Sequence, residues 1–210
     1  MTHVTVHGGK DGRLAPSGSV SAQRAAAISA LCLVAGGVIL GAVHHLAGNH
    51  DSPESRLASV AFGLPLFTAG LVALLGTRSA RPELWVAAGA AACPIAALSV
   101  IGLPVVIPAI VLIVLGVTRA ARWSWAEAVV AVGIAVALAG VFAMLVFHHD
   151  PATWTTPTGG GSSSDIITGA EIAVTVAVGI ATLAAAAATG GRSRTGPASA
   201  VHEAPPTELG

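Results

Sequence analysis

The chain is poor in charged residues. Only 10% of its 210 residues are Asp, Glu, Lys or Arg, against roughly 25% in an ordinary soluble domain, while 54% are hydrophobic. This composition excludes a water-soluble globular protein. The formal net charge is zero, so the chain also lacks the broad basic surface with which proteins bind the phosphates of nucleic acids. We therefore expect a membrane protein whose partners do not include nucleic acid.

Cysteine is also scarce, and its placement excludes a second class of protein. The two cysteines, Cys32 and Cys93, both lie inside apolar stretches, whereas a small secreted domain held by disulfides needs several cysteines at characteristic spacings. We expect each cysteine to be a small core residue. A disulfide between them is the alternative, because they would lie at similar depth if both helices begin on the same side of the membrane.

The residue patterns of catalytic sites are missing. An intramembrane protease would need paired aspartates, a Ser and His dyad or an HExxH helix at membrane depth, and the sequence has none of these. The glycine run at 159–161 precedes serines but lacks the lysine of a phosphate-binding loop, so it is typical of a linker. We therefore predict a protein without enzymatic activity and without a cofactor.

Ionisable residues in the middle of the apolar segments are missing as well. Glu127 and Glu171 are the only acids close to membrane depth, and each lies near the start of its segment, which argues against a proton pathway. We expect Glu127 to pair with Arg122 at the interface. The deeper polar groups are hydroxyls, which usually bond to the preceding turn of their own helix or to a neighbouring helix. These hydroxyl residues are Thr68, Ser99, Thr175 and Thr182.

One apolar run is too long for a single span. No charged residue occurs from Leu84 to Thr118, between Glu83 and Arg119. As one helix this run would be about 52 Å long, whereas the hydrocarbon core of a bilayer is about 30 Å thick. Even a steep tilt does not accommodate that length. We therefore predict a hairpin, and the residues at which it can turn are Pro94, Gly102, Pro104 and Pro108.

The apolar segments predict an all-α, polytopic helical membrane protein with a transmembrane domain over 22–189. The first segment is longer than the apolar part of a cleaved signal peptide, so we interpret it as a membrane helix. The third and fourth segments are short, and they are either two thin spans or a re-entrant hairpin. The six predicted spans are 25–47, 57–76, 84–101, 103–118, 124–147 and 167–189.

The distribution of basic residues supports six spans and predicts their orientation. Cytoplasmic segments of membrane proteins carry an excess of Lys and Arg. With six spans, Arg56 alone falls on one side, and both termini share the other side, which is therefore predicted to be cytoplasmic. The basic residues on that cytoplasmic side are Lys10, Arg13, Arg24, Arg78, Arg81, Arg119, Arg122, Arg192 and Arg194.

Segments outside the spans have their own signatures. The tails at 1–21 and 190–210 are rich in Gly, Ser, Pro and Thr, so we expect them to be disordered and cytoplasmic. The stretch 155–164, TTPTGGGSSS, is expected to be disordered at least in part. Tryptophans at the predicted cytoplasmic helix starts would lie among the lipid headgroups. These tryptophans are Trp85, Trp123 and Trp125.

Two further patterns concern helix packing. The stretches 59–85 and 99–125 share Gly-Leu-Pro, Gly, Arg and Trp positions at an offset that stays between 39 and 41. Either this is a repeat of helix pairs, or both stretches obey the same constraints on cytoplasmic helix ends. Gly37 and Gly41 match the GxxxG spacing, which marks close packing of helices.

Histidines supply the strongest lead to a ligand. His44, His45, His148, His149 and Asp150 all map to the outer ends of the first and fifth spans. Imidazole and carboxylate groups together suit zinc, copper, nickel or iron, so these residues are candidate metal ligands. Such a site needs helices one and five to touch. The alternative interpretation is that these polar side chains simply lie where the helices leave the lipid.

These observations lead to one expected function and two alternatives. The leading expectation is an integral protein of a bacterial plasma membrane that acts as a structural or interaction component, with the lipid bilayer and other membrane proteins or further copies of itself as partners. Nine arginines to one lysine, with abundant Ala, Gly, Val and Leu, are typical of a GC-rich bacterial genome. The alternatives are transition-metal binding or transport through the outer histidines, and a carrier of a small neutral solute.

Overall fold

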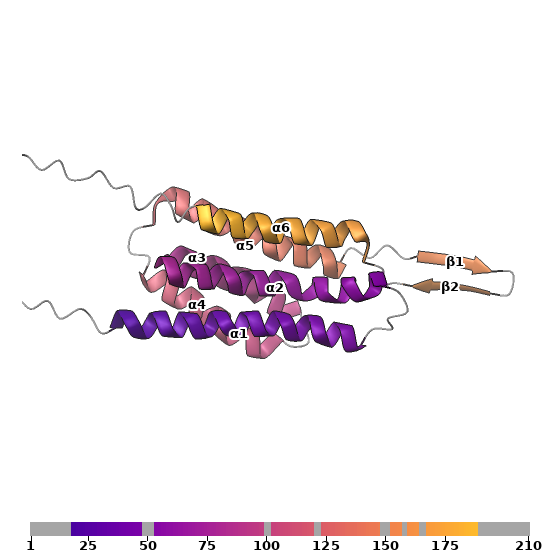
Figure 1. The fold of residues 1–210 in the computed structure, drawn as a ribbon, viewed down its shortest axis with the longest axis horizontal. Helices are drawn as coiled ribbons and strands as arrows, with labels where there is room; N and C mark the ends of the chain where they lie inside the picture. The colour runs from indigo at the N-terminus through magenta and orange to yellow at the C-terminus, as the bar shows by residue number, and fades with distance from the viewer. Residues whose placement is uncertain are drawn as a thin grey trace, which may run out of the picture.

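The chain folds into six helices and one β-hairpin (Figure 1). The computed structural model describes residues 18–47, 53–98, 102–119, 123–147, 152–156, 159–163 and 167–188. In chain order, the elements are α1 (Gly18–Ala47), α2 (Pro53–Ser79), α3 (Pro82–Leu98), α4 (Gly102–Arg119), α5 (Trp125–Phe147), β1 (Ala152–Thr156), β2 (Gly159–Ser163) and α6 (Gly169–Ala188). The helical class that the sequence predicts is therefore confirmed.

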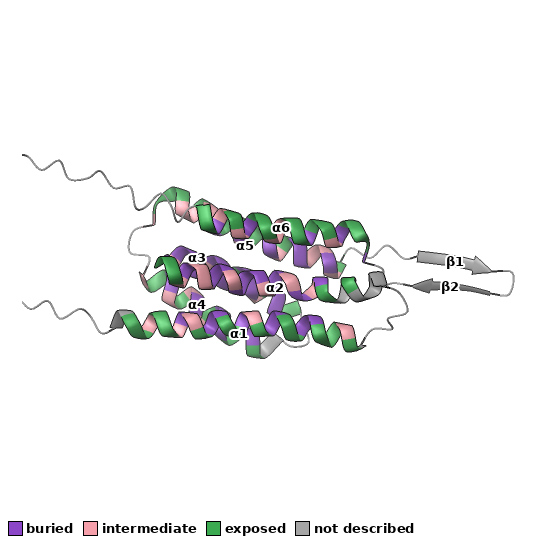
Figure 2. Cartoon of the chain, in the orientation of Figure 1, coloured by how far each residue is buried: buried purple, intermediate pink, exposed green. Residues whose placement is uncertain are grey.

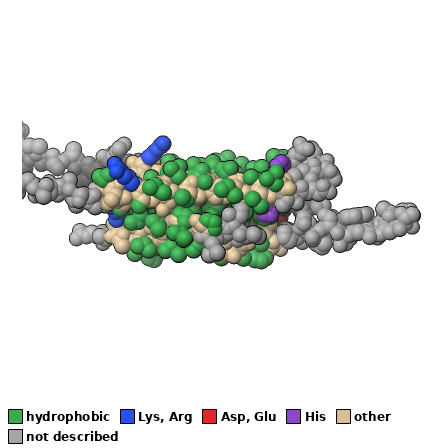
Figure 3. Space-filling model, turned by 90° about the horizontal axis from the view of Figure 1, so that it is seen from below, with side chains coloured by type: hydrophobic (Ala, Val, Ile, Leu, Met, Phe, Trp, Pro, Cys, Tyr) green, Lys and Arg blue, Asp and Glu red, His purple; other side chains and the backbone are tan. Residues whose placement is uncertain are grey.

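The helices lie side by side along one axis, and the start of α1 and the end of α6 lie at the same end of the bundle (Figure 1). We call this end the arginine end, because it carries Arg24, Arg78, Arg81 and Arg119. On the face drawn in Figure 3, Arg side chains gather at this end and His side chains at the other. The hairpin of β1 and β2 projects from the opposite end, which we call the hairpin end.

Two segments that were expected to be disordered, wholly or in part, contain regular secondary structure. Residues 18–21, expected in the disordered tail, form the first turn of α1; 1–17 and 189–210 lie outside the described residues. Within 155–164, expected to be at least partly disordered, two strands pair in antiparallel fashion, with Trp154 opposite Gly161 and Ala152 opposite Ser163. Ladder hydrogen bonds between the two strands order this glycine-rich stretch, which has no apolar pattern of its own.

Four helices are long and apolar enough to cross a membrane, judged by length and composition. They are α1, α2, α5 and α6. The other two are shorter: α3 has 17 residues and α4 has 18, which corresponds to about 26 and 27 Å. The charge-free run 84–118 is thus divided between α3 and α4, and these helices pack against each other as the predicted hairpin.

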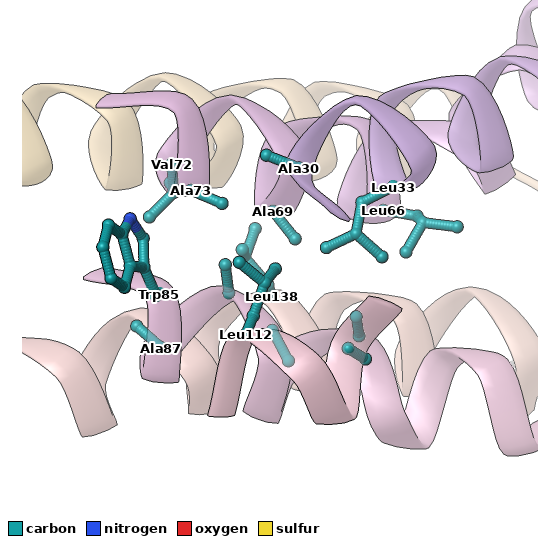
Figure 4. Close-up of a cluster of buried hydrophobic side chains, with 14 of the residues drawn as sticks. Ala30, Leu33, Leu66, Ala69, Val72, Ala73, Trp85, Ala87, Leu112 and Leu138 are labelled. Atoms are coloured by element: carbon teal, nitrogen blue, oxygen red, sulfur yellow. The ribbon is translucent and has the colours of Figure 1, made fainter. Parts of the chain in front are cut away.

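Helices α2 and α3 form the centre of the bundle. Helix α2 packs against α1, α3, α5 and α6, and α3 packs against α2, α4 and α5. Their inward residues form one apolar cluster with those of neighbouring helices, in which Leu66 of α2, Trp85 of α3 and Leu138 of α5 are buried (Figure 4). Outward positions are exposed but remain apolar, as Val132 and Val136 on α5 illustrate. Figure 2 shows exposed residues along the outer helices α1 and α6. An apolar exterior around an apolar core is suited to a lipid environment.

Glycines bring the paired helices into backbone contact. A Cβ atom built on Gly37 of α1 would lie 2.5 Å from the backbone nitrogen of Phe67 and 2.8 Å from the carbonyl oxygen of Gly63, both on α2. A Cβ atom on Gly89 of α3 would lie 2.5 Å from the carbonyl oxygen of Ala109 on α4. No side chain fits at either position, so the close packing predicted from the Gly37 and Gly41 spacing is confirmed.

The cysteine prediction is wrong for Cys32. Its side chain is exposed on the outside of α1, whereas Cys93 on α3 is half-buried, and both thiols are free. The predicted core position fails because the apolar stretch containing Cys32 has an outward face as well as an inward one. The alternative of a Cys32–Cys93 disulfide is excluded by the same observation.

The stretches 59–85 and 99–125 are similar in sequence, but the helices that they form pack differently. Helix α2 packs directly against α3, whereas the main partners of α5 are α3 and α6 rather than α4. The corresponding tryptophans also differ, since Trp85 is 1% exposed and Trp125 is 84% exposed. Shared constraints at helix ends therefore explain the two stretches better than a repeat of helix pairs.

Candidate functional site

The described histidines lie in the last turn of α1, at the hairpin end. The ring of His44 stacks on Phe62 of α2, with ring centroids 4.2 Å apart and the ring planes at 4°. His45 is half-buried beside the same helix. Both side chains therefore contribute to the contact between α1 and α2. The other candidates, His148, His149 and Asp150, lie outside the described residues.

The packing bears on the predicted metal site. Helix α1 packs against α2 and α4, whereas α5 packs against α3, α6 and α2. The neighbour that α1 and α5 share is therefore α2. Within the part of the chain that the structure describes, no three His, Cys, Asp or Glu residues form a group that could hold a metal ion. The described residues therefore leave metal binding by the outer histidines untested.

An open groove of about 430 Å³ runs between α1 and α2 toward the hairpin end. Its floor is formed by Gly37, Gly41 and Gly63, because these glycines hold the two backbones together without filling the space above them. Leu64 and Phe67 are among its apolar walls. His45 is the one polar side chain of its lining. The groove can accommodate an apolar group, but it has no acid, nucleophile or second imidazole for chemistry.

A buried ion pair lies at the arginine end. The Arg81 Nε donates to Glu83 Oε1 over 2.5 Å, and the two residues are 7% and 4% exposed. The Arg81 Nη1 also donates to the backbone carbonyl oxygen of Ala186, 3.4 Å away in the last turn of α6. The Arg81 side chain therefore joins the start of α3 to the end of α6. Sequence analysis missed this pair, although Arg81 and Glu83 flank the proline that begins α3.

The backbone before Arg81 makes the sharp reversal between α2 and α3. Ala80 has a φ of 55°, in the left-handed region that side chains with a Cβ rarely adopt. The Arg81 N–H donates to the carbonyl oxygen of Gly76 over 2.8 Å, which closes the last turn of α2. This reversal places Arg81 at the arginine end of the bundle core, where its side chain contacts Glu83 and the end of α6.

Trp85 does not lie at the lipid interface as predicted. It is buried against α2, and its indole nitrogen has no hydrogen-bond partner among the described residues. Figure 4 shows its ring beside Val72 and Ala73. The Arg119 guanidinium carbon lies over the ring, 5.8 Å from its centroid, within the range of a cation–π contact. The prediction failed because α3 turns this side of its first turn toward α2, so Trp85 enters the core.

The two membrane-depth acids cap helices. Glu127 Oε2 accepts a hydrogen bond from the Ser124 N–H over 2.9 Å, and Glu171 Oε2 accepts one from the Thr168 N–H over 2.7 Å. In return, the Ser124 and Thr168 hydroxyls accept from the N–H groups of the two glutamates. These are reciprocal capping boxes at the starts of α5 and α6. The predicted partner of Glu127, Arg122, lies outside the described residues.

The hydroxyls of Thr175 and Thr182 behave as the sequence predicts. The Thr175 hydroxyl donates to the carbonyl oxygen of Glu171 over 2.7 Å, and the Thr182 hydroxyl donates to that of Gly179 over 2.9 Å. Each bond returns to the preceding turn of α6. These hydroxyls are therefore satisfied locally. Ser99 lies outside the described residues.

Comparisons with known proteins add no assignment: no family model, no curated protein and no solved structure matches the chain. Conclusions about its function therefore rest on its own residues.

Proposed function

We propose that the chain is an integral protein of a bacterial plasma membrane and that it acts through contacts with other membrane components rather than through catalysis. In this proposal α1, α2, α5 and α6 cross the bilayer. Helices α3 and α4 enter from the arginine end and return to it, whether they span fully or as a re-entrant hairpin. Both termini then lie in the cytoplasm.

The observation that carries the proposal is that the described acidic side chains form an ion pair and helix caps. Three acids have described side chains, namely Glu83, Glu127 and Glu171, and each serves an ion pair or a helix cap at an end of the bundle. The described hydroxyls of α6 between those ends bond to their own helix. Ion and proton carriers keep ionisable groups near the middle of the membrane. The described polar groups therefore support a structural role.

The glycines of α5 support an interaction role. A Cβ atom built on Gly133 or Gly140 would meet nothing within 4 Å, whereas Gly37, Gly70 and Gly89 lie against neighbouring helices. Small residues allow the backbones of membrane helices to approach closely. No helix of the described chain packs closely against Gly133 or Gly140 of α5. Glycines on an uncovered face are what we expect of a helix that contacts a second membrane protein.

The proposed orientation is tested with reporters fused to the intact chain. Green fluorescent protein at the C-terminus becomes fluorescent only in the cytoplasm, and alkaline phosphatase becomes active only outside it. We expect a fluorescent fusion and an inactive phosphatase fusion. The start of α1 and the end of α6 both lie at the arginine end, and arginines favour the cytoplasmic side. A phosphatase-active C-terminus would contradict the orientation, and fusions recovered from the soluble fraction would contradict the membrane location.

The interaction role is tested by cross-linking within the membrane. A photoreactive amino acid at Val136, which is exposed on α5, is compared with one at Leu138, which is buried on the same helix. If α5 contacts a second copy, the Val136 position gives a product of twice the chain mass and the Leu138 position does not. Products with lipid alone at Val136 would contradict self-association through this helix.

A further inference from the structure

Arg24 and Arg78 lie at the same level of the bundle. A Cβ atom on Gly70 of α2 would contact Val34 and Ala30 of the antiparallel helix α1, which fixes the register of the two helices. Arg78 follows Gly70 by eight residues. Eight residues back along α1 from Ala30 and Val34 are positions 22 and 26, and Arg24 lies midway between them. Both arginines are exposed.

The level of Arg24 is that of a bilayer boundary. Twenty residues separate Arg24 from His44 along α1, a rise of about 30 Å, which equals the thickness of the hydrocarbon core. The residues between them carry no charge. If α1 crosses a membrane with this stretch in the lipid, the guanidinium groups of Arg24 and Arg78 lie at the depth of the lipid phosphates.

The positive charge of these two arginines is not balanced within the described chain. The one ion pair among the described residues joins Arg81 to Glu83, so that acid is already engaged. The other acid with a described side chain at this end, Glu127, caps α5, which packs against α2, α3 and α6. Among the described residues, the α1 and α2 side of the arginine end therefore has excess positive charge.

Apolar side chains continue from Arg24 along the same face of α1. Val20, Arg24, Ile28 and Leu31 follow one another at spacings of three or four residues, so they share one face of α1. Val20, Ile28 and Leu31 are all more than half exposed. The surface therefore presents guanidinium groups above a strip of exposed aliphatic side chains. This pairing complements an amphiphile with an anionic head and an apolar tail.

We infer that this surface binds an anionic phospholipid, with the phosphate between Arg24 and Arg78 and an acyl chain along Ile28 and Leu31. The inference rests on the membrane location proposed above. Arginine pairs with phosphate through parallel hydrogen bonds, and the apolar strip receives the chain at no cost in polar desolvation. A zwitterionic lipid offers the same tail but brings its own positive charge to the two arginines.

The test uses the full chain in detergent micelles that contain phosphatidylglycerol or phosphatidylcholine with identical acyl chains. Native mass spectrometry counts the lipid adducts of each type. We expect a preference for phosphatidylglycerol, and each of Arg24→Gln and Arg78→Gln lowers it about fivefold at low ionic strength. Arg56→Gln is the matched control, since it removes the same charge near the start of α2, at the hairpin end.

Each alternative outcome has a distinct reading. Equal binding of both lipids by the wild-type chain, or an unchanged preference in the Arg24→Gln, Arg78→Gln double variant, overturns the site. An equal loss in Arg56→Gln assigns the preference to total charge and overturns it too. Displacement of the phospholipid by soluble glycerol phosphate would show that the site binds the anionic group but not the acyl chain, which overturns the assignment to a phospholipid. If neither lipid binds and the protein stays soluble without detergent, the membrane location itself fails. Circular dichroism checks that every variant is folded.

Discussion

Arg81 links two helices at the arginine end of the bundle, α3 and α6. Its guanidinium group bonds to Glu83 at the start of α3 and to the Ala186 carbonyl group in the last turn of α6. The last four carbonyl groups of a helix have no partner within it, so this bond satisfies one of them. Because Arg81 and Glu83 are both buried, their ion pair compensates charge that solvent does not reach.

We predict that Glu83→Gln destabilises the protein strongly. The substitution removes the carboxylate charge that pairs with the buried Arg81 guanidinium group, and removal of one partner from a buried pair costs about 3 kcal/mol. The free energy of unfolding, measured by titration with a denaturing detergent, should fall by this amount. Glu127→Gln is the control, because it makes the same chemical change at a more exposed helix cap and should cost about 1 kcal/mol or less. Equal losses would contradict the role of the buried pair.

At the scale of elements, glycine decides which helices approach most closely. Gly37 and Gly63 place the backbones of α1 and α2 in contact, and Gly89 does the same for α3 against α4. The open groove beside Gly37 and Gly41 is a result of the same arrangement. Backbones this close gain dispersion contacts that do not depend on the hydrophobic effect, which is absent between helices in lipid. The pairs α1–α2 and α3–α4 are therefore the tightest units.

We predict opposite effects for two chemically identical substitutions. Gly37→Ala places a methyl group 2.5 Å from the Phe67 backbone nitrogen, so α1 must move away from α2 at a cost of about 1 to 3 kcal/mol. Gly133→Ala meets nothing within 4 Å, and it should be neutral or stabilise α5 by up to about 1 kcal/mol through helix propensity. Thermal unfolding of both variants in the same detergent measures the difference. Equal midpoints would contradict the close contact of α1 and α2.

At the scale of the whole molecule, the order of the helices bears on the predicted metal site. Helix α1, which ends with His44 and His45, packs against α2 and α4. Helix α5, after which His148 and His149 follow, packs against α2, α3 and α6. Helix α2 is therefore the neighbour that α1 and α5 share. The sequence predicts residues suited to metal, but the two helices that carry or precede them have different main partners.

We therefore predict that transition metals do not raise the unfolding midpoint. A ligand that binds only the folded protein, at 100 times its dissociation constant, stabilises it by about 2.7 kcal/mol. Thermal scans with zinc, copper, nickel and manganese would reveal such an effect. The comparison protein has alanine at His44, His45, His148 and His149. A rise in midpoint that disappears in this variant would contradict the prediction and establish a metal site at the hairpin end.

Much of the fold could be predicted because its signals are local. The absence of charge over 84–118, compared with the thickness of a bilayer, was enough to predict a hairpin. The hydroxyl bonds of Thr175 and Thr182 follow from the geometry of a single helix turn. The capping roles of Glu127 and Glu171 were visible in principle, since Ser124 and Thr168 precede them by three residues. The β-hairpin was not, because its strands have no apolar alternation.

By itself the sequence determined the class of this protein, a helical membrane protein. Its composition, the length of its apolar runs and the positions of its charges each match what a lipid bilayer requires of a segment. Only the tertiary structure decided which faces meet. It buried Trp85 rather than leaving it at the interface, and it left Cys32 exposed on the outside of α1. It also brought Arg81 to Ala186, which is 105 positions further along the chain. In a chain whose helices are apolar on every side, hydrophobicity does not mark the inward face, so contacts between distant backbones and small residues select it.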